Sequence, residues 1–186
     1  MGRASQAQAE ENRRRVVDTA SRLFREQGTQ VSVADLMKAA GLTHGAFYKQ
    51  FASKEALVDE AAAHAFAELT QRYSAGLERH DGQRDAAQQA LIDTYLSVEH
   101  RDDPADGCPV AALAIDIARE GGGREARRVY TEGAADFADF LATDDQDGIA
   151  RLCTLFGALV LSRATKGSPL SEEILAAAHA ALTETG

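Results

Sequence analysis

Hydroxyl and cationic side chains alternate with apolar ones in the segment GLTHGAFYKQFASKEAL, residues 41–57. Thr43 and Tyr48 carry hydroxyl groups, and Lys49 and Lys54 carry positive charges. Such groups donate hydrogen bonds to phosphate oxygens, and the backbone amides at a helix N-terminus bind the same anions. The residue types in this segment therefore favour contact with phosphates. An ordinary solvated helix face has a similar composition, and the spacing alone leaves that alternative open.

Lys54 supports the phosphate interpretation because of its position. It directly follows Ser53, whose hydroxyl is expected to cap a helix. A cation at the positive end of the helix dipole is unfavourable by about 0.3–1 kcal/mol, so an anion is expected nearby. A bound phosphate would supply that charge, and the neighbouring Glu55 is the alternative source.

Two predicted helices precede this segment. The sequence RRRVVDTASRLFREQG has apolar residues at three- and four-residue spacing and arginines on the opposite face, which predicts a first helix ending at Gly28. The sequence SVADLMKAAG predicts a second, short helix, which Ser32 and Asp35 cap and Gly41 ends.

Two more predicted helices contain the segment itself. Thr43 is expected to cap a third helix over HGAFYKQ, and Ser53 a fourth, longer one. Two short helices joined by a tight turn with a glycine form the helix-turn-helix pattern. Because Phe47 faces the core on a 3.6-residue period, part of the third helix remains exposed. The residues on that side are His44, Gly45, Tyr48 and Lys49.

The sequence SVADLMKAAGLTHGAFYKQFASKEAL closely resembles the helix-turn-helix signature of the TetR/AcrR family of transcriptional regulators. The resemblance covers roughly residues 10–60, and the helical remainder has the length of that family's ligand-binding and dimerisation domain. It implies an all-α homodimer, usually a repressor, whose third helix enters the major groove of a palindromic double-stranded DNA operator. It also implies release from the DNA by a small-molecule inducer.

The resemblance assigns roles to individual residues. The DNA contacts that it implies are Ser32, Thr43, His44, Gly45, Ala46, Tyr48, Lys49 and Lys54. Of these, His44, Gly45 and Ala46 match groove-facing positions, whereas Tyr48 and Lys54 match a phosphate clamp. Two features depart from the family pattern. Glutamine at position 50 replaces a frequent histidine, and the loop GTQVSV is one residue shorter than usual.

The composition indicates a globular, all-α protein with an uneven charge. The 186 residues are 45% apolar with three prolines, and alanine-rich segments without β-branched runs favour helices. Residues 1–54 hold nine Lys and Arg against five Asp and Glu, whereas residues 55–186 hold eleven against 24. We expect a helix-turn-helix DNA-binding domain over 1–54 and a ligand-binding and dimerisation domain over 55–186, with only the basic part meeting DNA.

Several other classes of protein are disfavoured. The sequence has neither an apolar run of membrane-spanning length nor a signal peptide, so we expect a cytoplasmic protein. The two cysteines and five histidines show no ligand spacing, so we expect no metal site and no cofactor. The segments EGGGRE and TDDQDG lack the residues that complete a P-loop and a calcium loop, and we expect no enzyme.

The last part of the chain predicts a dimer interface. The segment DGIARLCTLFGALVLSRA is apolar nearly all round, and SEEILAAAHAALTE has an alanine-rich face. We expect these two helices to form a four-helix interface with their symmetry mates. Its predicted residues are Leu152, Phe156, Leu159, Val160, Leu175, Ala178 and Leu182. Two buried helices within a monomer are the alternative.

The central part of the chain offers candidates for a ligand pocket. Breaks at HDGQ, DDPADG, EGGG, TDDQDG and KGSP predict five further helices after residue 80. The candidate ligand-binding residues on these helices and on the fourth one are Phe66, Tyr73, Tyr95, Cys108, Ile115 and Phe137. The sequence does not separate a pocket from an ordinary core.

Cys108 supports an alternative function. Pro109 suits the first turn of a helix, which places Cys108 at an N-terminus where the dipole stabilises a thiolate. The protein would then be an electrophile-sensing or redox-sensing regulator. Three nearby aspartates oppose a thiolate, and a buried cysteine that packs as a small hydrophobe is the other interpretation. A helical adaptor without DNA binding is a further alternative, which leaves the basic face of the third helix unexplained.

Overall fold

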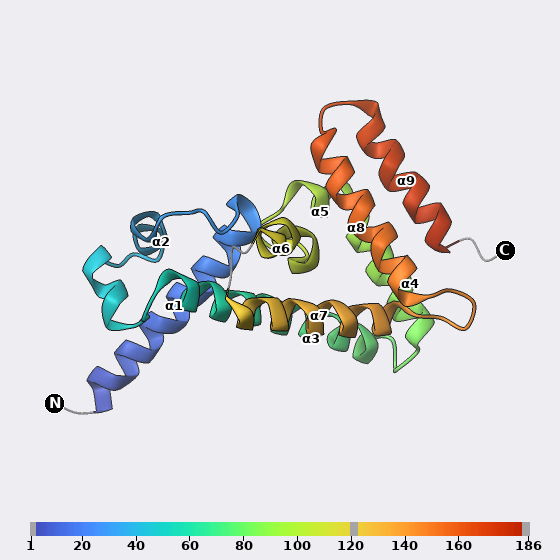
Figure 1. Cartoon of the computed structure of the whole chain (residues 1–186). Coiled ribbons are helices and arrows are strands. Elements are labelled where there is room, and N and C mark those ends of the chain that lie inside the picture. The colour runs from blue at the N-terminus through green and yellow to red at the C-terminus, as the bar shows by residue number, and fades with distance from the viewer. Residues whose placement is uncertain (1–2, 120–122, 184–186) are drawn as a thin grey trace.

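The computed structural model describes residues 3–119 and 123–183, and over these residues the protein is entirely helical, as predicted (Figure 1). Within this range it has nine α-helices and one 3-10 helix. They are α1 (Arg3–Gln27), α2 (Val33–Ala39), η1 (His44–Lys49), α3 (Lys54–Arg79), α4 (Arg84–Tyr95), α5 (Val98–Asp102), α6 (Pro109–Ala118), α7 (Arg124–Leu141), α8 (Gly148–Ala164) and α9 (Pro169–Thr183). None of them is long and apolar enough to cross a membrane.

Most of the predicted helix ends are confirmed. The Ser32 hydroxyl accepts a hydrogen bond from the Asp35 amide at 3.1 Å, and the Ser53 hydroxyl accepts one from the Ala56 amide at 3.2 Å. Gly41 has a φ of +69°, the left-handed conformation that glycine adopts at low cost. The predicted cap at Thr43 is wrong in one respect, because Thr43 occupies the N-cap position but its side chain makes no capping hydrogen bond.

Four other predictions of local structure need correction. The third helix is a 3-10 helix with i→i+3 hydrogen bonds, because it has only six residues between two turns. The first helix begins at Arg3, and its extension, RASQAQAEEN, contains neither glycine nor proline. Helix α5 was not predicted from the sequence, and Ser97 caps it by accepting a hydrogen bond from the His100 amide at 3.1 Å. Arg25, predicted on the exposed face of the first helix, is buried. Part of the predicted EGGG break, residues 120–122, lies outside the described residues.

The protein has two hydrophobic cores that share the long helix α3. The N-terminal core joins α1, α2, η1 and the first half of α3, and parts of α6 and α7 pack against it. The C-terminal core joins the second half of α3 to α4, α7, α8 and α9. Helices α3 and α7 lie side by side, and α2 and η1 lie at the opposite end of the molecule from α8 and α9 (Figure 1).

The buried Arg25 connects the two cores. Its guanidinium lies 2.9 Å from a carboxylate oxygen of Glu68 on α3 and donates a hydrogen bond of 3.4 Å to the carbonyl of Gly107, the residue before Cys108. Its Nε also donates to the Ser21 carbonyl at 3.2 Å. A buried guanidinium is stable only with such compensation, so these contacts hold α1, α3 and the start of α6 in one arrangement.

A glycine permits a close contact between α3 and α7. A Cβ atom on Gly133 would lie 2.1 Å from the ring of Phe66, whereas a Cβ atom on Gly76 of α3 would have no neighbour within 4 Å. Phe66 is buried, and its ring also packs edge-on against Tyr130, with ring centroids 5.6 Å apart. The pairing of these two helices therefore requires a residue without a side chain at position 133.

We predict that Gly133→Ala lowers the free energy of unfolding by about 1–3 kcal/mol, because the methyl group overlaps the Phe66 ring. Gly76→Ala is the matched control and should leave stability equal or raise it by up to about 1 kcal/mol, because alanine favours the helix and meets no neighbour. Urea denaturation at one protein concentration measures both. Equal stability of the two variants would contradict the close contact.

Candidate functional site

The exposed face of η1 lies as the sequence predicts. Phe47 is fully buried, whereas His44, Gly45, Tyr48 and Lys49 are exposed. Tyr48 is 66% exposed, and its ring packs edge-on against those of His44 and Phe47, with centroids 5.8 and 5.2 Å apart. This packing orients the Tyr48 hydroxyl without burying it. The remaining groove-facing candidate on η1, Ala46, is half-buried against the N-terminal core.

The residues around η1 differ in how their polar groups are used. The Ser32 hydroxyl caps α2 and donates a hydrogen bond of 2.6 Å to the Asp35 carboxylate. The Thr43 hydroxyl is exposed and does not cap η1. Lys54 is the first residue of α3, as predicted, and is half-buried. Ser32 is therefore engaged within the chain, whereas the Thr43 hydroxyl does not cap its own helix.

Glu55 provides a negative charge next to Lys54. A hydrogen bond from its own backbone amide, another from the Ser53 hydroxyl and the charge of Lys54 lower the pKa of the Glu55 carboxyl. The carboxylate thus lies at the positive end of α3, where the helix dipole favours it. Glu55 thus supplies a negative charge beside Lys54, so the position of Lys54 does not by itself require a bound phosphate.

Arg13 supports η1 and was missed by the sequence analysis. Its guanidinium lies over the Phe51 ring, 4.3 Å from the centroid. It also donates hydrogen bonds to the Gln50 carbonyl, directly after η1, and to the Glu60 carboxylate of α3. A signal was present in the sequence, because position 13 lies three residues before the apolar Val16 and so on the buried side of the first helix.

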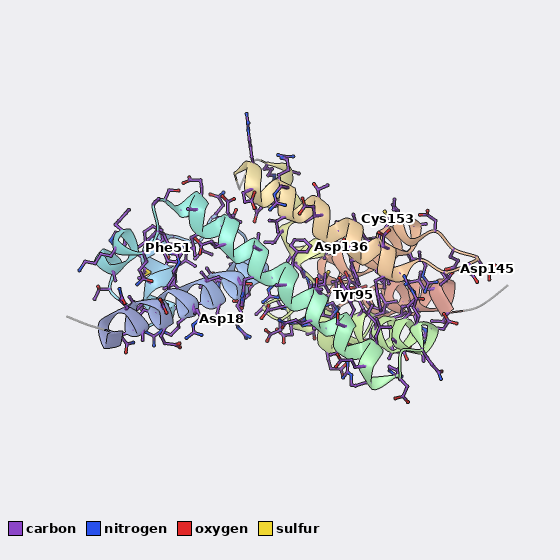
Figure 2. The ribbon with its side chains drawn as sticks, turned by 90° about the horizontal axis from the view of Figure 1, so that it is seen from below. Asp18, Phe51, Tyr95, Asp136, Asp145 and Cys153 are labelled. Carbon is purple, nitrogen blue, oxygen red and sulfur yellow. The ribbon has the colours of Figure 1, made fainter. Side chains whose placement is uncertain are left out.

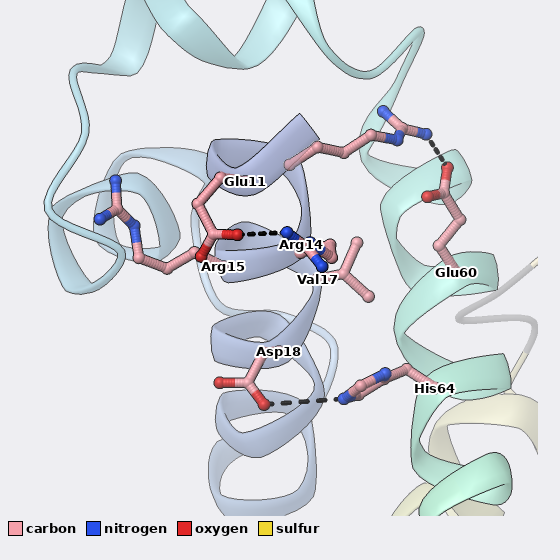
Figure 3. A pocket seen from close by; sticks show the side chains of 8 residues that line it. Glu11, Arg14, Arg15, Val17, Asp18, Glu60 and His64 are labelled. Carbon is pink, nitrogen blue, oxygen red and sulfur yellow. Dashed lines mark hydrogen bonds and ion pairs between the residues drawn. The ribbon is translucent and has the colours of Figure 1, made fainter. Parts of the chain in front are cut away.

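An open groove lies on the surface between α1 and α3, below these contacts (Figure 3). In it, the His64 Nε2 atom lies 3.6 Å from an oxygen of Asp18 and 3.6 Å from an oxygen of Glu68. One ligand atom from each of these three residues lies within 4.8 Å of the others, a spacing that a metal ion could bridge. The Arg25 guanidinium, 2.9 Å from Glu68, already supplies a positive charge there, so the cluster does not require an ion.

A second candidate site is a cavity of about 460 Å³ between α3, α4 and α7, which the start of α6 also lines. Four of the predicted ligand-binding residues line it, namely Tyr73, Tyr95, Cys108 and Phe137. The cavity lies apart from η1. Tyr95, which lines it, belongs to the C-terminal core, whereas Phe51, just after η1, belongs to the N-terminal core (Figure 2).

Two predicted ligand-binding residues do not line this cavity. Phe66 is part of the C-terminal core, where it packs against Tyr130 and Gly133. Ile115 is 55% exposed on the outer side of α6. Both were selected for apolar character alone, which does not indicate the direction in which a side chain points.

Aromatic rings and a few polar groups form the wall of the cavity. The Tyr73 ring stacks on Phe140 at 4.8 Å between centroids, and the Tyr95 ring contacts that of His100 at 4.7 Å. The His100 Nδ1 atom lies 2.7 Å from the Tyr95 carbonyl, and burial lowers the pKa of the imidazole. His100 is therefore neutral near pH 7, with Nδ1–H donating to the carbonyl and Nε2 left as an acceptor.

Cys108 does not have the environment of an activated thiol. It is the N-cap residue of α6, as predicted, but it is buried, and this burial raises the pKa of the thiol. Hydrogen bonds from the Ala111 amide and from Tyr95 oppose the effect without reversing it. The predicted stabilisation of a thiolate by the helix dipole is therefore smaller than the cost of burying the charge.

Most of the residues predicted for a dimer interface lie inside the protomer. Leu152, Leu159, Leu175, Ala178 and Leu182 are buried in the C-terminal core, where they pack α8 and α9 against each other and against neighbouring helices. The predicted face is thus largely the internal face of this helix pair. The sequence showed two apolar sides on α8 but not which of them faces inward.

The outer side of α8 and α9 is also apolar. Ile149 is 65% exposed and Leu161 is 55% exposed, and Leu170 is exposed where α9 begins. Phe156 and Val160, both predicted for the interface, are only half-buried. Cys153 is also exposed on α8 (Figure 2).

Comparisons with known proteins agree with this geometry. Residues 16–61, which include α2 and η1, match the model of the family described as bacterial regulatory proteins, tetR family. The HTH-type transcriptional regulator AcrR of Shigella flexneri is 41% identical over 61 residues. That match covers 32% of this chain and spans only 28% of the length of AcrR.

Solved structures extend the likeness of fold to nearly the whole chain. The reduced form of E. coli NemR has a TM-score of 0.76 at 19% identity, covering 93% of this chain and 95% of that one. A TetR-family regulator from Agrobacterium tumefaciens has a TM-score of 0.76 at 17% identity, covering 95% and 100% of the two chains. AibR, solved with isovaleryl coenzyme A and operator DNA, has a TM-score of 0.62 at 15% identity, covering 91% and 97%.

The sequence match is confined to the N-terminal helices, and the similarity of fold includes the C-terminal helices as well. The matched family consists of regulators rather than enzymes. Residues 16–61 therefore carry the helix-turn-helix of the tetR family of bacterial regulatory proteins, and the chain has the fold of TetR-family regulators.

Proposed function

We propose that the protein is a repressor that binds a palindromic operator as a homodimer and leaves it when a small molecule occupies the C-terminal cavity. The exposed face of η1 carries the DNA-binding part of this proposal. Tyr48 and Lys49 lie on that face, and the buried Phe47 fixes it to the N-terminal core. A rigid element that presents polar and cationic groups is suited to the major groove.

The contacts of η1 fall into two kinds in this proposal. His44, Gly45 and the half-buried Ala46 meet base edges, and Lys49 lies at the edge of the groove. The Tyr48 and Thr43 hydroxyls and the Lys54 ammonium bind phosphates, and Ser32 contributes at the start of α2. Arg13 holds η1 in place through Gln50 and Phe51. Base contacts would set sequence preference, whereas phosphate contacts would set affinity and register.

Helix α6 connects the cavity with the DNA-binding helices. Cys108, at its start, lines the cavity, and Asp116, near its end, accepts a hydrogen bond of 2.7 Å from the Thr29 amide just after α1. The contact is close, because a Cβ atom on Gly28 would lie 3.0 Å from the Asp116 carboxylate. In our proposal, a ligand that moves the start of α6 also moves Asp116, and with it the end of α1.

The outer side of α8 and α9 is the proposed dimer surface. Its exposed residues, Ile149, Leu161 and Leu170, are apolar and lie on adjacent helices. Together with Phe156 and Val160 they would form a continuous patch of the kind that subunit interfaces cover. Dimerisation would place two copies of η1 on one palindrome.

The alternatives have less support. The burial of Cys108 and its raised pKa disfavour an electrophile sensor that acts through this thiol. An adaptor without DNA binding would leave unused the helix-turn-helix segment that matches the family model. The structure of AibR with a ligand and operator DNA supports a mode of action in which a protein of this fold binds both.

We predict that Lys54→Ala weakens binding to all DNA sequences alike and reduces the slope of log K against log salt by about one per half-site, because one fewer counterion is released. Tyr48→Phe should also weaken binding uniformly, whereas changing His44 should alter base preference at about 1–3 kcal/mol per affected pair. Fluorescence anisotropy over a series of salt concentrations measures these effects. Lys166→Ala, distant on the loop after α8, is the control. An unchanged affinity and salt slope in Lys54→Ala would refute the phosphate clamp.

We predict that Leu161→Glu produces monomers, because dimerisation would bury an unpaired carboxylate. Ile115→Glu is the matched control, since Ile115 is as exposed as Leu161, at 55%, but lies on α6. Light scattering at micromolar concentration measures the mass of each variant. Leu159 is unsuitable for this test because it is fully buried within the protomer. A wild type that is already monomeric, or a Leu161→Glu dimer of unchanged affinity, would disprove the proposed interface.

A further inference from the structure

The lining of the C-terminal cavity has a charge opposite to that of its surroundings. Residues 55–186 contain 24 Asp and Glu against eleven Lys and Arg. Among the described residues that line the cavity, however, Arg72 and Arg79 are positively charged, His100 is neutral, and no Asp or Glu occurs. In so acidic a part of the chain, a lining of this kind favours an anionic occupant.

The two arginines of the lining retain hydrogen-bonding capacity. Arg72 donates a hydrogen bond of 2.6 Å to the Asp106 carbonyl, and Arg79 donates one of 3.3 Å to the Ala75 carbonyl. Within residues 3–119 and 123–183 neither forms an ion pair with a carboxylate, although many other arginines of the chain do. Those that do are Arg13, Arg14, Arg22, Arg25, Arg101 and Arg128. Because a guanidinium has five donors, each arginine can still bind a carboxylate.

The arginines lie at the entrance of the cavity, and the apolar groups lie at its floor. Arg72 and Arg79 are exposed, whereas Leu69 and Phe137 are buried. Gly76 lies between the arginines on the same face of α3, and a Cβ atom there would have no neighbour within 4 Å. The absence of a side chain at this position leaves space between the charged entrance and the floor.

The floor contains a polar atom without an oxygen or nitrogen partner. Tyr95 is 6% exposed, and within the described residues its hydroxyl makes no hydrogen bond to oxygen or nitrogen. The thiol of Cys108 lies beside it and is at best a weak acceptor. A buried hydroxyl normally has a partner, so this one is suited to an oxygen or nitrogen atom of a bound molecule.

We propose that the cavity binds an amphipathic organic acid, whose hydrocarbon or aryl part packs against Leu69, Tyr73 and Phe137 and whose carboxylate binds Arg72 and Arg79. The inference rests on the proposed function, in which this cavity takes the regulatory ligand. A cavity of about 460 Å³ is within the size range of small-molecule sites. Charge at the entrance and apolar area at the floor together select a molecule with one anionic end.

The experiment compares acids with neutral molecules of the same shape. The probes are 4-phenylbutyrate with 4-phenylbutyramide, and octanoate with octanamide, titrated into the full chain by calorimetry. We expect each acid to bind the wild type roughly ten-fold more tightly than its amide, because only the acid forms charge-assisted hydrogen bonds with the arginines. Arg72→Gln and Arg79→Gln should each reduce this preference. Arg128→Gln, an exposed arginine on α7, is the control and should not change it.

Two outcomes would overturn the inference. One is that the amides bind as tightly as the acids, or that neither binds. The other is that both arginine variants keep the full preference for the acid. Operator binding by the same preparation separates this inference from the proposed function. DNA binding without acid binding would refute only the ligand class, whereas acid binding without DNA binding would refute the repressor and leave the acid site in place.

Discussion

The buried charge of Arg25 constrains the arrangement of the whole molecule. Its guanidinium is nearly excluded from water and is compensated by Glu68 of α3 and by the carbonyls of Ser21 and Gly107. An uncompensated charge at this position would be strongly destabilising, so these groups must remain together when the protein is folded. Helix α1 packs against α2 and η1 in the N-terminal core, and Gly107 directly precedes Cys108 at the cavity. The same contacts therefore hold the two candidate sites in one arrangement.

The shared helix α3 limits how the two cores move relative to each other. Its first half contributes Leu57, Val58, Ala61 and Ala62 to the N-terminal core, and its second half contributes Phe66 and Leu69 to the C-terminal core. A continuous helix transmits rotation but does not bend easily without a proline, and α3 has none. In the proposed function, the short α6 is the element through which a change in the cavity reaches α1, by way of the hydrogen bond between Asp116 and Thr29. Energetic coupling of this kind requires two arrangements that a ligand stabilises differently.

The sequence predicted the fold and the location of the η1 face, because the helix caps and the helical periodicity are local signals. Ser32, Ser53 and Gly41 act as expected. The errors arise where tertiary contacts decide the outcome. Leu159 was assigned to a subunit interface but is buried in the protomer, since periodicity identifies an apolar side but not what covers it. Cys108 was considered for its helix position, whereas its burial controls the thiol. The role of Arg25 depends on residues far away in the sequence, and no local pattern indicates it, whereas for Arg13 the helical spacing to Val16 indicated burial but not its partners.

In the proposed function, two copies of η1 read a palindrome. The most direct test is to select DNA from a random pool with the full-length protein and to map the complex by hydroxyl-radical footprinting. We expect enriched sequences with two-fold symmetry and two protected half-sites, whose centres lie roughly 34–36 Å or a multiple of that distance apart. Selected sequences without two-fold symmetry, or the absence of any enriched sequence, would contradict it.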